Sequence, residues 1–145
     1  MEFPVRIPFV ETLGFELLSF DAGRAEMAID LRDELSNAWS VLHGGVSMTL
    51  LDVVMVHAAR SPNQPGHPTS PGLVTIEMKT TFMRPGVGRL IGRGTLLHRT
   101  ASMAFCEASL FDAAGLIVAQ ATGTFKYMRG LPVGAKKIER LDASD

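Results

Sequence analysis

The most constraining feature of this sequence is a segment, residues 45–60, that is apolar on nearly every side of a helix. One side carries Val46, Leu50, Val53, Val54 and Ala58, and much of the remainder is covered by Met48, Leu51, Met55 and Ala59. A helix that is apolar all round is stable in water only when other elements surround it. The fold must therefore wrap around this helix, and we expect all of its faces to be buried.

The other apolar segments are short and have the lengths of β-strands. The sequence predicts a hairpin from residues 15–20 and 24–31 around the turn Asp21-Ala22-Gly23. Four more strands are expected within 72–86 and at 89–98, 102–111 and 116–128. Short links between the last three favour an antiparallel meander.

In the strand within 72–86, apolar and polar residues alternate. Strict alternation places Val74, Ile76, Met78 and Phe82 on one face, and Thr75, Glu77, Lys79 and Thr81 on the other.

The remaining segments have the composition of a short helix, a loop and a tail. Residues 5–13 are expected to form a short helix that ends at Gly14. The proline-rich residues 61–72 are expected to form a loop. The predicted fold class is α+β, with an antiparallel sheet of about six strands around one helix. We expect one domain, residues 1–129, and a flexible C-terminal tail, residues 130–145.

Charge and composition narrow the classes of partner. A net charge of −1 and a pI near 6.4 supply no basic surface for nucleic acid. The single cysteine, Cys106, excludes an internal disulfide and suits a reducing compartment. The N-terminus has no leader-like segment and the apolar runs are too short to span a membrane. We therefore expect a cytoplasmic protein that does not interact with membranes, and its 46% hydrophobic content suggests contacts between copies.

Asp52 is the one acidic residue inside the apolar segment. A carboxylate removed from water is costly unless it is paired, neutralised or retained for chemistry. His57 lies five positions away, outside the three-or-four spacing of helical pairs, so a local ion pair is doubtful. Asp52 is a candidate general base or nucleophile, and the sequence does not separate these two roles.

A pattern of residues around Asp52 resembles a known family. Asn37, His43-Gly44-Gly45 and Asp52, followed later by Met83-Arg84-Pro85-Gly86, resemble the hotdog-fold acyl-CoA thioesterases, specifically the phenylacetate-pathway (PaaI-like) group. The resemblance covers about residues 10–128. It implies hydrolysis of the thioester between an acyl or aryl group and coenzyme A, with no metal and no organic cofactor.

The two glycines, Gly44 and Gly45, lie where the apolar helix begins. Their N–H groups are among the unsatisfied donors at its positive end, so they can stabilise the carbonyl oxygen of a thioester as an oxyanion hole. The alternative is that paired glycines only make a tight turn.

The resemblance also implies roles for less certain residues. His43 and Asn37 would orient the thioester or a water molecule, although His43 could equally cap the helix. Thr75 matches a position that carries a hydroxyl near the acid, or it is an ordinary strand threonine. The arginines are candidates for the nucleotide end of coenzyme A, with Arg84 assigned to substrate binding; the others are Arg89, Arg93, Arg99 and Arg129.

The distance between Gly44 and Asp52 predicts a shared active site. Eight residues of helix rise about 12 Å, so one thioester carbonyl cannot reach both groups of one chain. The oxyanion donor of one chain must meet Asp52 of another. A homodimer is thus the smallest active unit, and the resemblance suggests a homotetramer.

Two other functions use the same scaffold. A non-catalytic acyl-CoA sensor or binding module is the main alternative, but binding alone would not require an acid beside a neutral thioester. A hotdog-fold dehydratase would pair an active histidine with a differently placed acid, and that pattern is not found in this sequence.

Overall fold

The computed structural model describes residues 1–62 and 72–128. In chain order, the elements are α1 (Pro8–Leu13), β1 (Glu16–Asp21), β2 (Arg24–Asp30), a 3-10 turn (Asp33–Leu35), α2 (Gly44–Arg60), β3 (Gly72–Phe82), β4 (Arg89–Arg99), β5 (Met103–Phe111) and β6 (Ile117–Met128). Most of the expected loop at 61–72 and the whole expected tail at 130–145 lie outside the described residues.

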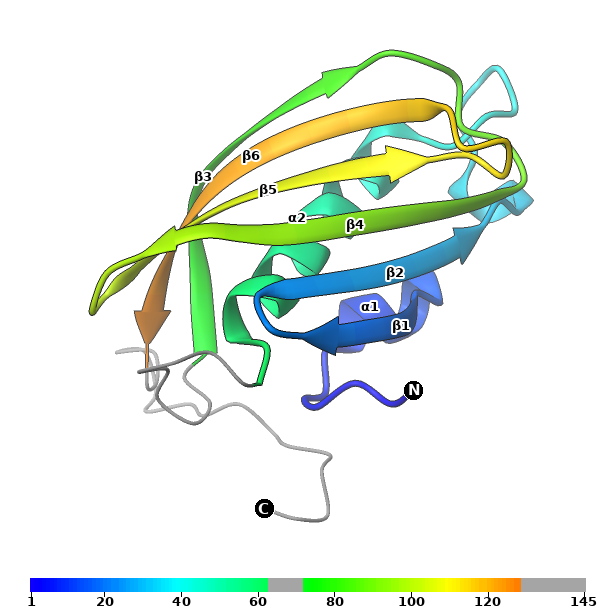
Figure 1. Ribbon diagram of the computed structural model, residues 1–145. Coiled ribbons are helices and arrows are strands. Elements are labelled where there is room, and N and C mark those ends of the chain that lie inside the picture. The colour runs from blue at the N-terminus through cyan, green and yellow to red at the C-terminus, as the bar shows by residue number, and fades with distance from the viewer. Residues whose placement is uncertain (63–71, 129–145) are drawn as a thin grey trace.

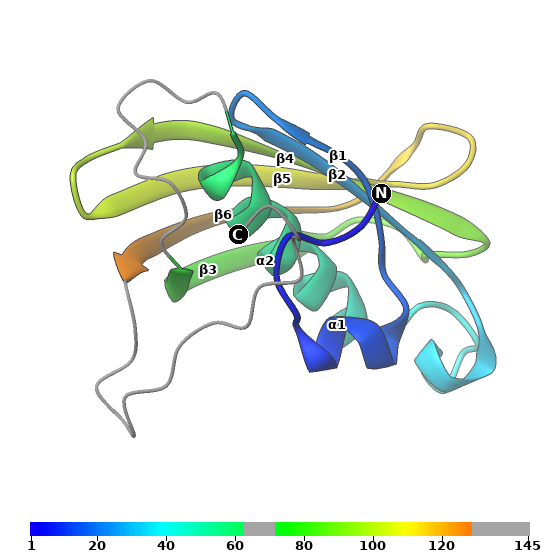
Figure 2. The ribbon, with the colours of Figure 1, turned by 90° about the horizontal axis from the view of Figure 1, so that it is seen from below.

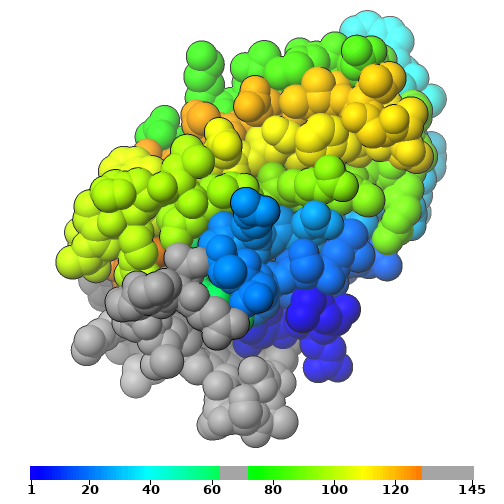
Figure 3. Space-filling model, viewed as in Figure 1, coloured from blue at the N-terminus to red at the C-terminus, as the bar shows by residue number. Residues whose placement is uncertain are grey.

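The six strands form one sheet whose inner face holds α2 (Figures 1 and 2). The strand order is β1-β2-β4-β5-β6-β3, and all neighbours are antiparallel. The predicted α+β class and the meander β4-β5-β6 are confirmed. β3 pairs with β6 and forms the far edge, and the sequence did not indicate this placement. Figure 3, drawn from the outer side, shows the strands covering almost all of α2.

Close approach of α2 to the sheet depends on glycines in the strands. A Cβ on Gly94 of β4 would lie 2.7 Å from the carbonyl oxygen of Val54, and one on Gly92 would overlap Leu50. Both Leu50 and Val54 are fully buried. The sheet therefore curves around the helix at positions where β4 has no side chain.

The first helix is shorter than expected. It begins at Pro8, whereas the sequence predicted residue 5. Ile7 has the extended backbone that a residue before proline prefers, so the helix cannot begin earlier. Gly14 ends it in the left-handed region, with φ of 80°, as predicted.

A β-bulge in β3 overturns the expected alternation. Thr75 pairs with Phe125 and Glu77 pairs with Thr124, so Ile76 is left without a partner. The extra residue reverses the side chains that precede it. Thr75 therefore points toward α2, and the predicted common face of Val74 with Met78 and Phe82 is wrong.

Helix α2 is not buried on every side, contrary to the sequence prediction. Gly45 and Met48 are exposed and Asp52 is half-buried, along one line of the helix. These positions are three or four residues apart and share one face. This open line runs from the start of the helix to Asp52. The Asp52 carboxylate and the first turn of α2 are therefore accessible from outside the sheet.

Candidate active site

Asp52 is held by a residue of the neighbouring edge strand. The Thr75 hydroxyl donates a hydrogen bond of 2.7 Å to Asp52 Oδ1. Partial burial raises the pKa of Asp52, and the bond from Thr75 lowers it by a smaller amount. The Asp52 carboxylate is thus more basic than that of an ordinary aspartate, and the bond from Thr75 fixes its orientation.

His43 caps α2 with its side chain. Its Nδ1 accepts a hydrogen bond of 2.8 Å from the N–H of Gly45. An accepting Nδ1 places the proton of the neutral ring on Nε2, which is then a donor. The Gly45 N–H is occupied by this cap, so Gly45 is not an available oxyanion donor in this conformation.

Gly44 keeps a backbone N–H that is available to a ligand. It is the first residue of α2, and no acceptor for its N–H is found in the part of the chain that the structure describes. The ring of Phe82 would lie 3.3 Å from a Cβ at this position. The available donor at the start of α2 is therefore the Gly44 N–H.

Asn37 shapes the loop that precedes α2. Its Oδ1 accepts hydrogen bonds from the N–H groups of Trp39, at 2.9 Å, and Val41, at 3.4 Å. This carbonyl oxygen is engaged within its own loop. Asn37 therefore stabilises its own loop, and within the chain it does not contact Asp52.

The two ends of the candidate site lie far apart in one chain. The helix is continuous from Gly44 to Arg60, so Gly44 and Asp52 are separated by about 12 Å along its axis. Strand β3 follows the same path, with Thr75 beside Asp52 and Phe82 beside Gly44. A single chain does not bring the acid and the oxyanion donor to one reacting carbonyl.

Two other titratable residues are excluded from the site by burial. His57 is fully buried, donates from Nδ1 to the Val53 carbonyl at 2.8 Å, and packs against Phe3 and Phe20. Burial lowers its pKa to about 4. Burial also raises the pKa of Cys106 to about 12, so its thiol is a poor nucleophile.

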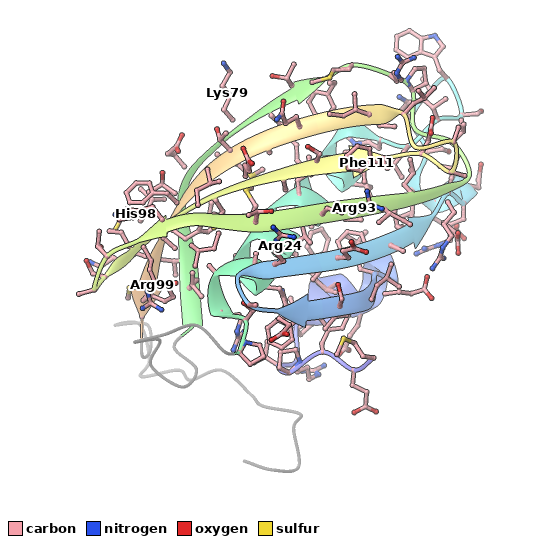
Figure 4. All side chains as sticks on the ribbon, viewed as in Figure 1. Arg24, Lys79, Arg93, His98, Arg99 and Phe111 are labelled. Carbon is pink, nitrogen blue, oxygen red and sulfur yellow. The ribbon has the colours of Figure 1, made fainter. Side chains whose placement is uncertain are left out.

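The candidate arginines differ in their surroundings. Arg89 pairs with Glu16 at 2.7 Å and with Asp30 at 3.1 Å, and Arg93 pairs with Glu26 at 3.2 Å. Arg93 also lies over the Phe111 ring, as Figure 4 shows, and Arg99 lies over Tyr127. Arg129 is outside the described residues. Arg84 is exposed and has no carboxylate partner within the described ranges.

Residues 1–62 and 72–128 contain no cluster of three or more His, Cys, Asp or Glu side chains that could hold a metal ion. None of the helices in these ranges has the length and apolar character needed to cross a bilayer.

Comparison with known proteins identifies the family. The sequence model of the Thioesterase superfamily matches residues 40–133, which make up more than half of the chain. The chain belongs to this superfamily. The medium/long-chain acyl-CoA thioesterase YigI of Salmonella typhimurium is 27% identical over 135 residues, which cover 85% of this chain and 87% of that protein. This thioesterase superfamily member is a thioester hydrolase.

Solved structures confirm the hotdog fold. A conserved protein from Pseudomonas aeruginosa aligns with a TM-score of 0.78 and 27% identity, covering 86% of this chain and 97% of that one. The E. coli PaaI protein from the phenylacetic acid degradation operon aligns with a TM-score of 0.74 and 20% identity, covering 83% of each chain. The fold expected from the resemblance is therefore correct.

One residue next to the site was not singled out from the sequence. Phe82, which lies against Gly44, is half exposed at the end of β3. The sequence analysis treated it only as part of an apolar strand face. Nothing local marks it, because its contact with Gly44 joins segments that are 38 residues apart.

Proposed function

We propose that the protein hydrolyses acyl-coenzyme A thioesters in an active site formed between two copies of the chain. The observation that carries the proposal is the half-buried Asp52, whose pKa is raised and whose direction is fixed by Thr75. It lies on the open line of α2, beside an edge strand. A basic carboxylate in such a position suits attack on a neutral thioester.

In the proposed reaction, the Gly44 N–H of one copy stabilises the developing oxyanion. Asp52 of the second copy removes a proton from water as the water oxygen adds to the carbonyl carbon. The C–S bond then breaks, and the coenzyme A thiolate recovers the proton. Alternatively, Asp52 attacks the carbonyl itself, and water hydrolyses the resulting anhydride.

A homodimer is the smallest unit in which both groups can meet. The edge strand β3 and the open line of α2 lie side by side, so a second copy that covers this edge can approach both. We propose a homodimer as the active unit and its further assembly into a homotetramer. The protein would act in the cytoplasm, without nucleic acid or membrane partners.

Two further residues have proposed roles in substrate binding. His43 would donate a hydrogen bond from Nε2 to the substrate or to water, and Arg84 would contact coenzyme A.

The relatives support coenzyme A as the thiol carrier, because the Salmonella protein is named a medium/long-chain acyl-CoA thioesterase. The acyl group preferred by this chain is best determined with a panel of aryl, short-chain and long-chain acyl-CoA esters.

The decisive experiment is free-thiol release by Asp52→Asn. The amide preserves the shape of the side chain but neither accepts a proton as a carboxylate does nor attacks the thioester. We expect turnover to fall by about a hundredfold or more, as is usual for loss of an acid–base group. Asp112→Asn is the matched control, because Asp112 accepts N–H bonds from Ala114 and Leu116 in a turn, a role that asparagine can fill.

Wild-type turnover by Asp52→Asn would refute the role of Asp52. Tight binding of acyl-CoA by the wild-type protein, without thiol release from any ester of the panel, would instead support the non-catalytic sensor.

A further inference from the structure

Several hydrogen bonds cross the loop that precedes α2. The Asn37 side chain accepts the N–H groups of Trp39 and Val41, and its backbone N–H bonds the Val41 carbonyl at 2.9 Å. A bridge between Ser36 and Leu42 closes the loop. Ser40 has a φ of 60°, an unfavourable value for a residue with a side chain. Such a backbone persists only where the surrounding bonds impose it.

This ordered loop presents the only tryptophan of the chain to solvent. Trp39 is 84% exposed, the highest exposure among the large apolar side chains of the described residues. An indole can bury a large area and stack on flat ligands, and it gains neither benefit in water. A hydrogen-bonded loop that displays a tryptophan therefore has the character of a binding element.

Trp39 and the candidate oxyanion donor, Gly44, belong to adjoining segments of the chain. Five residues separate it from Gly44, so the two Cα atoms are at most about 17 Å apart. The loop also contacts residues 83–88, because the Leu42 N–H donates to the Gly86 carbonyl at 2.8 Å. Arg84 lies on that second loop. Two adjoining loops at the start of α2 thus carry an exposed indole and a guanidinium that has no partner among the described residues.

The other candidate arginines do not share this setting. Arg93 and Arg99 already lie over aromatic rings, and Figure 4 shows Arg99 at the end of the sheet away from the start of α2. Arg89 is paired with two carboxylates. Among the candidate arginines in the described residues, Arg84 alone has no ionic or aromatic partner.

We infer that Trp39 and Arg84 form the subsite for the nucleotide end of coenzyme A, with the indole stacked on the adenine and the guanidinium paired with a phosphate. This inference rests on the proposed function. The nucleotide is the part of an acyl-CoA that joins a flat aromatic base to negative charge. An aliphatic acyl chain offers neither feature and would leave Arg84 unused.

The single tryptophan makes the subsite directly measurable. Coenzyme A should change the fluorescence of Trp39 saturably, whereas pantetheine, which lacks the adenosine and all phosphates, should leave it unchanged. For Trp39→Ala we expect KM for acyl-CoA to rise about tenfold, within the range for loss of one base stack, while kcat stays within about twofold. With the corresponding acyl-pantetheine, kcat/KM should equal that of the wild type.

Two further variants sharpen the test. Trp39→Phe should recover most of the lost affinity, and Phe9→Ala, which removes another exposed aromatic side chain, should change neither constant. Arg84→Gln should raise KM for acyl-CoA and not for acyl-pantetheine.

Three results would overturn the inference. One is unchanged Trp39 emission at coenzyme A concentrations that inhibit thiol release. Another is an equal loss on acyl-CoA and acyl-pantetheine. The third is emission that responds to protein dilution and not to coenzyme A, which would place Trp39 between copies of the chain. Absence of thiol release from every acyl-CoA would instead refute the proposed function, and the fluorescence titration would still test the nucleotide subsite.

Discussion

At the scale of single residues, hydrogen bonds decide which polar groups remain available for chemistry. His43 occupies the Gly45 N–H and leaves that of Gly44, so the two neighbouring glycines are not equivalent. Thr75 donates to one oxygen of Asp52. That bond stabilises the carboxylate and opposes the effect of burial on its pKa. The basicity of Asp52 is therefore set by two opposing contributions, of which burial is the larger.

Thr75→Val tests this balance through the pH profile of kcat/KM. The substitution removes the hydrogen bond that lowers the Asp52 pKa, so the pKa should rise further above its ordinary value. Less carboxylate is then ionised at a given pH, and the acidic limb of the profile should move to higher pH. The plateau at higher pH should be less affected than the limb. Thr75→Ser keeps the hydroxyl and should retain the wild-type limb; a limb that stays in place in Thr75→Val would contradict the assigned contact.

At the scale of elements, the start of α2 combines a helix terminus with a reactive position. Its first residue, Gly44, carries an N–H that has no partner within the helix. His43 before it has φ of −62° and ψ of 134°, a conformation that also suits a residue before proline. Proline is favoured at the first helical position, where no backbone donor is lost from the helix itself. This geometry allows the N–H to be removed while the helix is retained.

We expect Gly44→Pro to lose more activity than Gly44→Ala. Both substitutions place a Cβ near the Phe82 ring, but only proline removes the N–H, and loss of one oxyanion donor typically costs about a hundredfold or more in kcat. Steady-state thiol release, with circular dichroism to verify the helix, makes the comparison. Equal losses in the two variants would show that crowding against Phe82, rather than the missing donor, is responsible.

At the scale of the whole molecule, the sheet leaves one side of α2 open beside its edge strand. Within the described residues, β3 pairs with β6 alone, and its side chains reach both Asp52, through Thr75, and Gly44, through Phe82. About 12 Å of helix separates these two residues within a chain. A site built from the Gly44 of one chain and the Asp52 of another therefore requires two copies. One functional site needs an intact Gly44 in the first copy and an intact Asp52 in the second, and it does not need both residues in the same copy.

Refolding a mixture of Asp52→Ala and Gly44→Pro chains tests the shared site. Each variant alone should be inactive. In a mixed dimer, the intact Gly44 of one chain meets the intact Asp52 of the other, while the second site has both defects. Random pairing makes about half of the dimers mixed, each with one good site of two, so about a quarter of wild-type activity should return. No recovery, with folding and exchange verified, would show that the site is not shared in this way.

The sequence by itself determined the identity of the elements and singled out the acid that we propose as the catalytic residue. A long apolar segment with one acid predicted α2 and drew attention to Asp52, and short apolar runs bounded by turn residues predicted six strands. These are local properties, because helical and strand periodicities are set by neighbours within a few positions. The resemblance carried by Asn37, the residues from His43 to Gly45, and Asp52 is also local, and it led to the correct family.

Only the tertiary structure decided which of these residues meet. The bulge at Ile76 turns Thr75 toward Asp52, and β3 reaches its edge position by pairing with the last described strand, β6, where Thr75 lies opposite Phe125. The His43 cap and the isolation of Arg84 likewise depend on where side chains and loops come to lie. Bulges and strand order are selected by packing between distant segments, and strict alternation within one strand carries no signal of either. The sequence therefore supplied the residues of the proposed site, whereas long-range packing specified their partners.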